Sequence, residues 1–146
     1  MISSTVTLTN TTPTGRQFVA TSGTGHHLII DDANGNTGAK PIELVAVALA
    51  GCTAFDVINI LRKKRQRVTA YSVRCEADQT TETPNVFTKV RIHHTITGED
   101  VAAQAVEDAI RLSEEKYCSV GAMIKQGAEI TTTFEILASD AVLTRN

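Results

Sequence analysis

The sequence predicts an α+β domain whose elements follow the order βββ-α-ββ-αα-β along the chain. Segments near both ends alternate apolar and polar residues and are bounded by turn residues, a pattern typical of strands. A long apolar segment, residues 41–66, predicts a buried central helix. The chain has 146 residues, of which 42% are hydrophobic, and this composition suits a single domain over residues 1–146.

The first part of the chain predicts a meander of three strands, over residues 2–11, 16–22 and 26–31. The first two strands are separated by Pro13-Thr14-Gly15 and the next two by Gly23-Thr24-Gly25, which are residue types that tight turns favour. The polar residues 31–38 predict a flexible connection to the helix that follows.

The helix over residues 41–66 begins with Pro41, a residue suited to the first helical position, and carries Glu43 in its first turn. Its apolar residues lie on every side, so we expect protein to cover it all around. Its uncharged stretch is interrupted by Asp56 and is too short to span a bilayer, so we expect no membrane partner.

Basic residues gather where this helix ends, at Arg62, Lys63, Lys64, Arg65 and Arg67, although the net charge of the chain is −2. Cations at a helix C-terminus interact favourably with the helix dipole and reach into water. We therefore interpret the cluster as a solvated helix end and expect no nucleic-acid partner.

The second half of the chain predicts two strands, over residues 71–77 and 86–96, then two helices and a last strand over residues 130–136. The segment Thr97-Gly98-Glu99-Asp100 resembles a capping sequence for an amphipathic helix over 101–117. A shorter helix over 118–126 stops before Gly127.

Three cysteines are an odd count, and no signal segment precedes them, so we expect reduced thiols and a cytoplasmic location. Cys52 lies within the apolar helix, where a cysteine often only fills space. Cys118 opens a predicted helix, whose free N–H groups would stabilise a thiolate and lower the thiol pKa. Cys75 alternates with apolar residues on a strand, which favours core packing.

The sequence offers little for a metal or a nucleotide. The pairs His26-His27 and His93-His94 are adjacent on predicted strands, so the two side chains of each pair point to opposite faces and cannot chelate one ion. We therefore expect no metal. Neither a glycine-rich phosphate loop nor a Gly-x-Ser-x-Gly elbow is present.

Two groups of residues resemble a known family. Pro41-Ile42-Glu43-Leu44 with Ala50-Gly51-Cys52, followed by Glu115-Lys116-Tyr117-Cys118-Ser119-Val120, is similar to the OsmC/Ohr family of osmotically inducible and organic hydroperoxide resistance proteins, over nearly the whole chain. The segments 39–44 and 51–57 look closest to the YhfA-like branch of that family.

The resemblance implies an OsmC-like intertwined homodimer, with two active sites at the subunit interface. It further implies that Cys52 attacks an organic hydroperoxide to give a sulfenic acid, and that Cys118 resolves this acid as a disulfide. A dithiol reductant, either a lipoylated protein or a small thiol, would reopen the disulfide. No bound cofactor is required.

Three further residues are candidates for the site. Arg16 follows Gly15 as in the peroxidase members, whose guanidinium lowers the pKa of the cysteine; an exposed strand-start arginine is the other interpretation. The glutamate of the peroxidase pattern is replaced by Ile42, and Glu43 is turned by about 180° from Cys52 around the helix. Asp56 shares the face of Cys52, and we expect it to orient a cation there or to make a structural hydrogen bond.

Two other functions stay open. The first is a non-enzymatic OsmC-like stress protein that binds a small hydrophobic molecule and has sensor or relic cysteines. The second is a disulfide reductase or redox chaperone, although the chain lacks Cys-x-x-Cys spacing. The sequence assigns no role to His93, His94 or Tyr117.

Overall fold

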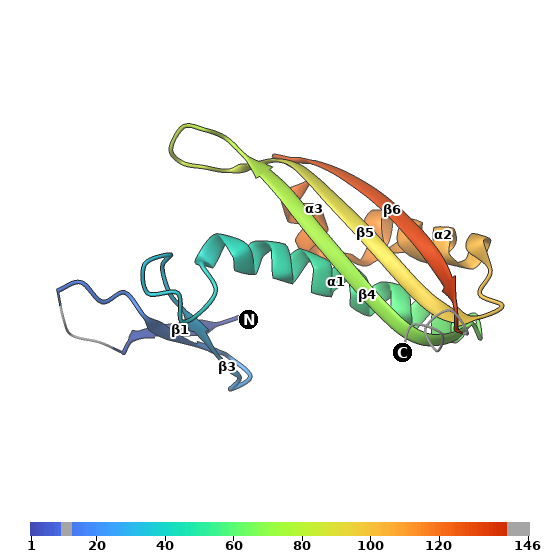
Figure 1. The fold of residues 1–146 in the computed structure, drawn as a ribbon, viewed down its shortest axis with the longest axis horizontal. Helices are drawn as coiled ribbons and strands as arrows, with labels where there is room; N and C mark the ends of the chain where they lie inside the picture. The colour runs from blue at the N-terminus through green and yellow to red at the C-terminus, as the bar shows by residue number, and fades with distance from the viewer. Residues whose placement is uncertain (10–12, 140–146) are drawn as a thin grey trace. The chain divides into compact units, whose positions relative to one another are not determined.

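The computed structural model describes residues 1–9 and 13–139 and confirms an α+β chain with the predicted order of elements (Figure 1). Its elements divide between two compact units, Met1–Val45 and Ala46–Asn146. The division falls in the first turns of the long helix, and the chemistry described below lies in the second unit.

The N-terminal unit contains the predicted meander. Strand β2 (Phe18–Ser22) pairs in antiparallel fashion with β1 (Ser4–Leu8) on one side and with β3 (His27–Ile30) on the other. All three strands are shorter than predicted, and residues 10 and 11 of the predicted first strand lie outside the described residues.

The connection after β3 is held by hydrogen bonds, contrary to the flexible segment that its composition predicts. The Asp31 carboxylate is buried and accepts the backbone N–H groups of Asp32 at 2.7 Å and Thr37 at 3.1 Å. Asp32 in turn accepts Nε–H of Arg16 at 2.7 Å. A polar loop therefore becomes ordered because its own acidic side chains satisfy its backbone donors.

The C-terminal unit contains a sheet in the order β4-β5-β6, formed by β4 (Arg67–Gln79), β5 (Phe87–Glu99) and β6 (Glu129–Ala138). Strands β4 and β5 are antiparallel, whereas β5 and β6 are parallel. A parallel pair needs a crossover connection, and the helical segments between β5 and β6 provide it.

Helical segments lie along one face of this sheet (Figure 1). They are α1 (Pro41–Lys63), α2 (Ala103–Leu112), the π-helical turn η1 (Ser113–Tyr117) and α3 (Ser119–Ile124). Helix α1 ends three residues before the predicted boundary at 66, and Arg65, just beyond it, has a positive φ of 57°.

The apolar core of the unit consists of two clusters. The first includes Val57 and Leu61 of α1, Ile96 of β5 and the buried face of α2. The second includes Leu49 of α1, Val90 and Ile92 of β5, Cys118 and Ala128. Each cluster therefore joins helix to strand, and α1 contributes to both.

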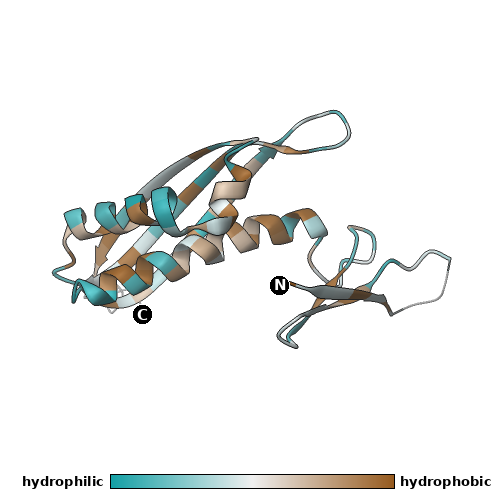
Figure 2. Cartoon of the chain, turned by 180° about the vertical axis from the view of Figure 1, so that it is seen from behind, coloured by the Kyte–Doolittle hydropathy of each residue, from teal (hydrophilic) through white to brown (hydrophobic). Residues whose placement is uncertain are grey.

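Within one copy of the chain, the surface of α1 is buried along one stripe only. Its composition predicts that protein covers it all around. The buried residues are spaced by four: Leu49, Thr53, Val57 and Leu61. Val47 and Phe55 are 63% and 79% exposed, and Figure 2 shows apolar residues along much of the helix. Contrary to the sequence prediction, α1 is long and apolar enough to cross a membrane by length and composition alone, a criterion that core helices of soluble proteins also meet.

The start of α2 differs from the sequence prediction. Thr97, Gly98 and Glu99 continue β5, and the N-cap residue of α2, Ala102, makes no capping hydrogen bond through its own side chain. The Ala102 N–H donates to Oε1 of Gln66 at 2.9 Å, so a side chain from the segment between α1 and β4 takes the role of the cap.

The predicted helix over 101–117 is also interrupted, because the α-helix ends at Leu112 and one π-helical turn follows. The Cys118 N–H donates to the Ser113 carbonyl at 2.8 Å, five residues back. This wider turn ends at Cys118, which is the N-cap of α3.

The basic cluster lies at the end of α1 in the structure, as the sequence predicts. Lys64 pairs with Asp108 at 3.5 Å and Arg67 with Glu99 at 3.2 Å, and all four side chains are at least partly exposed. Exposed pairs of this kind contribute little to stability, so the cluster is a solvated helix end.

Candidate active site

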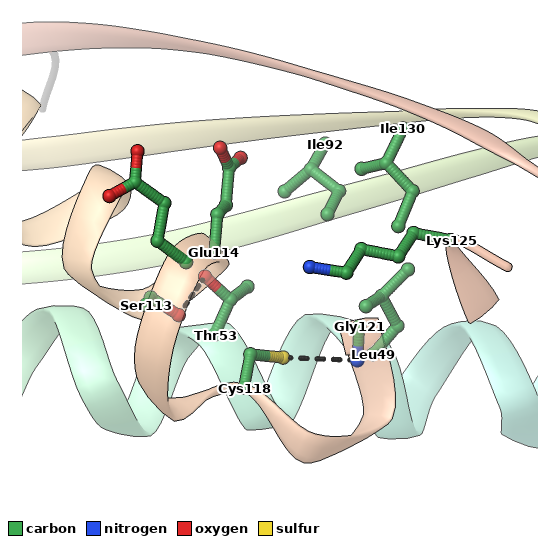
Figure 3. Close-up of a pocket in the computed structure, with 10 residues that line it drawn as sticks. Leu49, Thr53, Ile92, Ser113, Glu114, Cys118, Gly121, Lys125 and Ile130 are labelled. Atoms are coloured by element: carbon green, nitrogen blue, oxygen red, sulfur yellow. Dashed lines mark hydrogen bonds between the residues drawn. The ribbon is translucent and has the colours of Figure 1, made fainter. Parts of the chain in front are cut away.

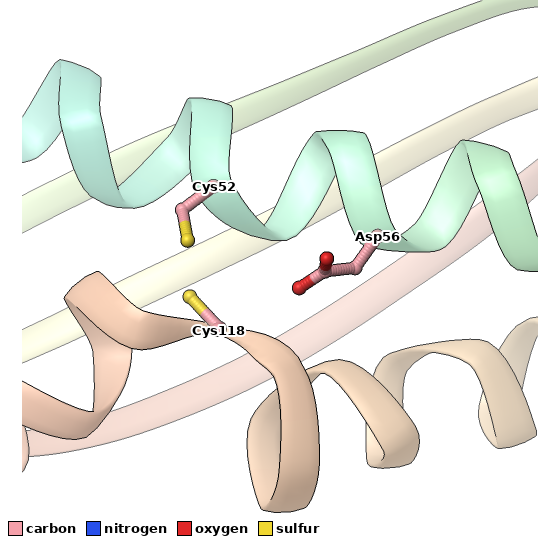
Figure 4. Close-up of side chains that lie close together, drawn as sticks. All are labelled: Cys52, Asp56 and Cys118. Carbon is pink, nitrogen blue, oxygen red and sulfur yellow. The ribbon is translucent and has the colours of Figure 1, made fainter.

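Two sulfur atoms and a carboxylate meet between α1 and the turn that precedes α3 (Figure 4). Cys52 and Asp56 come from successive turns of α1, and Cys118 comes from the junction of η1 and α3. One ligand atom from each of the three residues lies within 4.8 Å of the others. Cys52 and Asp56 share one face of α1, and Cys118 lies opposite them.

Cys118 occupies a buried position with a defined hydrogen bond. Its side chain is only 6% exposed, and its Sγ accepts the Gly121 N–H at 3.3 Å. A Cβ atom on Gly121 would lie 3.1 Å from that sulfur, which is tighter than ordinary contact. Glycine at this position therefore lets the backbone approach the thiol.

The pKa of Cys118 is raised, which is opposite to the sequence prediction. Burial is the largest cause, followed by the hydrogen bond with Cys52, while the Gly121 N–H lowers the pKa by less. The contact with Cys52 thus favours the protonated form of Cys118. The predicted helix-start geometry is present, but burial outweighs it.

A chain of hydroxyl groups supports Asp56 from the side of the π turn. The Ser113 hydroxyl donates to Oδ2 of Asp56 at 2.9 Å and lies 3.1 Å from Oγ1 of Thr53. Serine has one hydroxyl hydrogen and a carboxylate only accepts, so Thr53 must donate to Ser113 when Ser113 donates to Asp56. Asp56 therefore has a structural hydrogen bond, one of the two predicted roles.

A second buried polar pair lies on the sheet. Tyr71 of β4 and His94 of β5 stack with their ring centroids 5.9 Å apart, and Oη of Tyr71 lies 2.7 Å from Nδ1 of His94. Among the described residues, His94 Nε2 is a buried nitrogen with no hydrogen-bond partner. Burial, and then the charge of Asp56, raise the pKa of Tyr71.

Along both α1 and β5, these polar groups lie between residues of one apolar cluster and residues of the other. Thr53 follows Leu49 and precedes Val57 on the buried stripe of α1. His94 follows Ile92 and precedes Ile96 on the buried face of β5. The core of the unit is thus interrupted by a polar layer at the level of the thiols.

A pocket of about 270 Å³ opens beside Cys118 (Figure 3). Leu49, Ile92 and Ile130 form apolar walls, and Thr53, Ser113 and Cys118 add polar atoms. Glu114, Glu115 and Lys125 also line the pocket and bring charges of both signs. Pockets with apolar walls and a few polar groups are typical ligand sites.

The other predicted site residues have separate local roles. Arg16 belongs to the N-terminal unit, where it pairs with Asp32 and keeps 70% of its side chain exposed. Glu43 accepts the Lys40 N–H at 3.0 Å and so caps the start of α1. A role of either residue in the thiol chemistry stays a prediction.

Cys75 and the histidines behave as their strand positions predict. Cys75 packs at the border of the second cluster, and burial raises its pKa. His94 is fully buried, whereas His93 is on the other face and lies 2.7 Å from Oγ1 of Thr133. The described residues contain one group of side chains able to share a metal ion, and it is Cys52, Asp56 and Cys118.

Sequence reasoning missed Ser113 and Thr53 as supports of the site. Both are hydroxyl residues within otherwise apolar stripes at helical spacing, and that is the signal by which they could have been found. The π turn had no recognisable signal, and without it the approach of Ser113 to Asp56 could not be predicted.

Comparisons with known proteins agree with this structure. The profile of the OsmC-like protein family matches residues 33–133. Protein YhfA of Escherichia coli K12 is 38% identical over 125 residues, which cover 86% of this chain and 93% of YhfA.

Solved structures show the same fold. A hypothetical protein from Aquifex aeolicus is 26% identical with a TM-score of 0.83, covering 95% of this chain and 98% of that protein. An organic hydroperoxide resistance protein from Elizabethkingia anophelis is 18% identical with a TM-score of 0.66, covering 93% and 96% of the two chains.

The buried His94 predicts a pH-dependent stability. Burial, and then the charge of His93, lower the pKa of His94 to about 4, so the unfolded chain binds more protons than the folded chain between pH 6.5 and pH 4. The free energy of unfolding should therefore fall as pH is lowered through this window, by on the order of 3 kcal/mol. Denaturant titrations at a series of pH values measure it.

The matched variants are His94→Gln and His93→Gln. The first should flatten the dependence of stability on pH in that window, and the second should reduce the slope only slightly, because burial is the larger cause of the lowered His94 pKa. A wild-type slope retained in His94→Gln would contradict the assignment.

Proposed function

Since the chain belongs to the OsmC-like protein family, we propose that it is a thiol-dependent peroxidase that reduces organic hydroperoxides. The observation that carries the proposal is the meeting of Cys52, Cys118 and Asp56 within 4.8 Å. A disulfide has an S–S bond of about 2.05 Å, so two sulfurs this close have only a short distance to move before they bond.

In the first step, the Cys52 thiolate attacks one oxygen of the peroxide. The O–O bond breaks, the other oxygen leaves as an alkoxide that takes up a proton, and Cys52 becomes a sulfenic acid. Sulfur is oxidised by two electrons while the peroxide is reduced to an alcohol. Cys52 is assigned as the nucleophile because the family resemblance gives it that role, and because burial raises the pKa of Cys118 and so keeps that thiol protonated.

In the second step, the Cys118 sulfur attacks the Cys52 sulfenic acid. The thiol proton combines with the departing hydroxide to form water, and the disulfide remains. The raised pKa of Cys118 keeps it mainly as a thiol, the less reactive form, so that it competes little with Cys52 for the peroxide. A dithiol reductant, either a lipoylated protein or a small thiol, then reopens the disulfide.

The pocket beside Cys118 supports an organic substrate. Leu49, Ile92 and Ile130 would bury the hydrocarbon part of a hydroperoxide, which hydrogen peroxide lacks. Burial of a few methylene groups, at about 0.8 kcal/mol each, is enough to favour an alkyl hydroperoxide by tenfold or more.

In this proposal, Asp56 takes the role of the glutamate in the peroxidase pattern, whose position Ile42 occupies in this chain. Ser113 fixes one of its oxygens, so the carboxylate keeps a defined orientation one helical turn from Cys52. It would orient a cation beside the nucleophile, and Arg16 stays the predicted cation.

The working form in this proposal is a homodimer. Val47 and Phe55 are exposed apolar residues on α1, and Val6 and Leu8 of β1 are exposed as well. A second copy of the same chain would bury these exposed apolar surfaces. The three free cysteines further suit the cytoplasm, a reducing compartment.

One observation favours a second candidate function. The pocket is large enough for a small apolar molecule, and Cys118 lines it whereas Cys52 does not. A protein that binds a hydrophobic ligand next to a sensor thiol would show the same features. Such a protein would not turn over peroxide, which distinguishes the two functions.

The peroxidase proposal predicts different roles for the three cysteines. Cys52→Ser should lose oxidation by cumene hydroperoxide by at least about 100-fold, because no comparable nucleophile replaces the thiolate. Cys118→Ser should keep the first oxidation but lose recycling by a dithiol. Stopped-flow oxidation with cumene hydroperoxide and with hydrogen peroxide measures both steps.

Cys75→Ser is the matched control and should react as the wild type does. Equal rates for the two peroxides together with an active Cys52→Ser would eliminate the peroxidase and leave the ligand-binding function.

Substitution of Asp56 tests the carboxylate. Asp56→Asn should lower the second-order rate of peroxide reduction by about tenfold, equivalent to about 1.4 kcal/mol of transition-state stabilisation. Circular dichroism and thermal unfolding would show whether the variant is folded. Full peroxidase activity in a folded Asp56→Asn variant would leave Asp56 with a structural role alone.

The homodimer is tested at Phe55. Phe55→Asp should raise the dimer dissociation constant by at least about thirtyfold, since a buried aromatic anchor contributes about 2 kcal/mol or more. Sedimentation velocity over a concentration series measures the change, with Glu107→Gln on α2 as an exposed control. A wild-type chain that stays monomeric at micromolar concentration would refute the dimer.

A further inference from the structure

We propose that the reduced site is also a metal site, in which Cys52, Asp56 and Cys118 bind one soft divalent cation such as Zn²⁺. This assignment goes beyond the peroxidase, because it needs no peroxide and no change in the oxidation state of sulfur. Each sulfur that carries a proton releases it to solvent when the metal binds.

The spacing of the three side chains suits a tetrahedral ion. Zinc bonds to sulfur at about 2.3 Å and to carboxylate oxygen at about 2.0–2.2 Å, which puts two ligand atoms of one ion roughly 3.5–3.8 Å apart. The ligand atoms of Cys52, Asp56 and Cys118 already lie within 4.8 Å of one another. A contraction of at most about 1.3 Å would complete the geometry.

The chemistry of the donors selects the ion. Two thiolates are soft ligands that favour Zn²⁺ and related ions, while Mg²⁺ and Ca²⁺ require six or more oxygen ligands. This site offers one carboxylate, so hard cations are poorly matched. Three protein ligands leave one tetrahedral position for water, as in zinc sites that stay open.

Two hydrogen bonds from neighbouring protein groups support the ligand atoms. The Gly121 N–H donates to Cys118 Sγ at 3.3 Å, and the Ser113 hydroxyl donates to Asp56 Oδ2 at 2.9 Å. Bonds of this kind orient metal ligands and typically change metal affinity 10- to 100-fold. Residues from α1, the π turn and α3 thus hold the ligands independently of any substrate.

Metal binding and disulfide formation exclude each other, because both use the same two sulfur atoms. A bound cation would protect the reduced thiols from oxidation and would stop peroxide reduction until it is removed. This regulatory consequence rests on the proposed function, whereas the binding itself does not.

The test is a titration of the reduced, metal-free full chain with Cd²⁺ under anaerobic conditions. The ultraviolet thiolate-to-cadmium charge-transfer band reports sulfur ligation directly, and competition with a chromophoric chelator gives the Zn²⁺ affinity. We expect one ion per chain and no binding to the Cys52–Cys118 disulfide form.

Variants assign the ligands. Cys52→Ser and Cys118→Ser should each weaken Zn²⁺ binding by more than about 100-fold, the upper effect of a supporting residue, and Asp56→Asn by roughly 10- to 100-fold. Cys75→Ser is the control and should bind as the wild type does. Asp56→Asn keeps the side-chain shape and both thiols, so it tests the site even if a cysteine variant fails to fold.

No charge-transfer band in the reduced wild type, or equal affinity in wild type and Asp56→Asn, would overturn the metal site as assigned. Loss of binding in Cys75→Ser would also overturn it. A chain that binds Zn²⁺ at these residues but leaves cumene hydroperoxide intact keeps the metal site and loses the peroxidase. A chain that reduces cumene hydroperoxide but binds neither Cd²⁺ nor Zn²⁺ keeps the peroxidase and loses the metal site.

Discussion

The chemistry of this chain depends on one contact, where the π turn Ser113–Tyr117 meets the middle of α1. The turn brings the Ser113 hydroxyl to Asp56 at 2.9 Å and ends at Cys118, whose sulfur lies within 4.8 Å of the ligand atoms of Cys52 and Asp56. Buried hydroxyl, thiol and carboxylate groups are costly unless they have partners. Each of these groups supplies the partner that another needs, so the polar layer persists between two apolar clusters.

The same contact accounts for both proposed activities. The two sulfurs lie close together before any peroxide arrives, and the carboxylate beside them adds a third donor atom for a metal. Disulfide formation removes two electrons from the pair, whereas metal binding removes only protons. The proposed peroxidase and the proposed metal site would therefore be alternative states of the same two sulfurs.

Much of the fold could be predicted from the sequence, because hydrophobic periodicity and turn residues are local signals. The order of elements, the start of α1 at Pro41 and the opposite faces of His93 and His94 all followed from such patterns. The pairing of Cys52 with Cys118 came from resemblance to a family. Features that depend on tertiary packing were missed or reversed: the π turn, the cap that Gln66 supplies to α2, and the raised pKa of Cys118.

The central claim is that Cys52 and Cys118 are reactive partners, and peptide mapping after oxidation tests it most directly. The reduced chain is treated with one equivalent of cumene hydroperoxide, its remaining thiols are alkylated, and the peptides are analysed by mass spectrometry without reduction. We predict one disulfide joining the Cys52 and Cys118 peptides, with Cys75 alkylated. A disulfide that includes Cys75, or a sulfinic acid on Cys52 with Cys118 alkylated, would contradict the account.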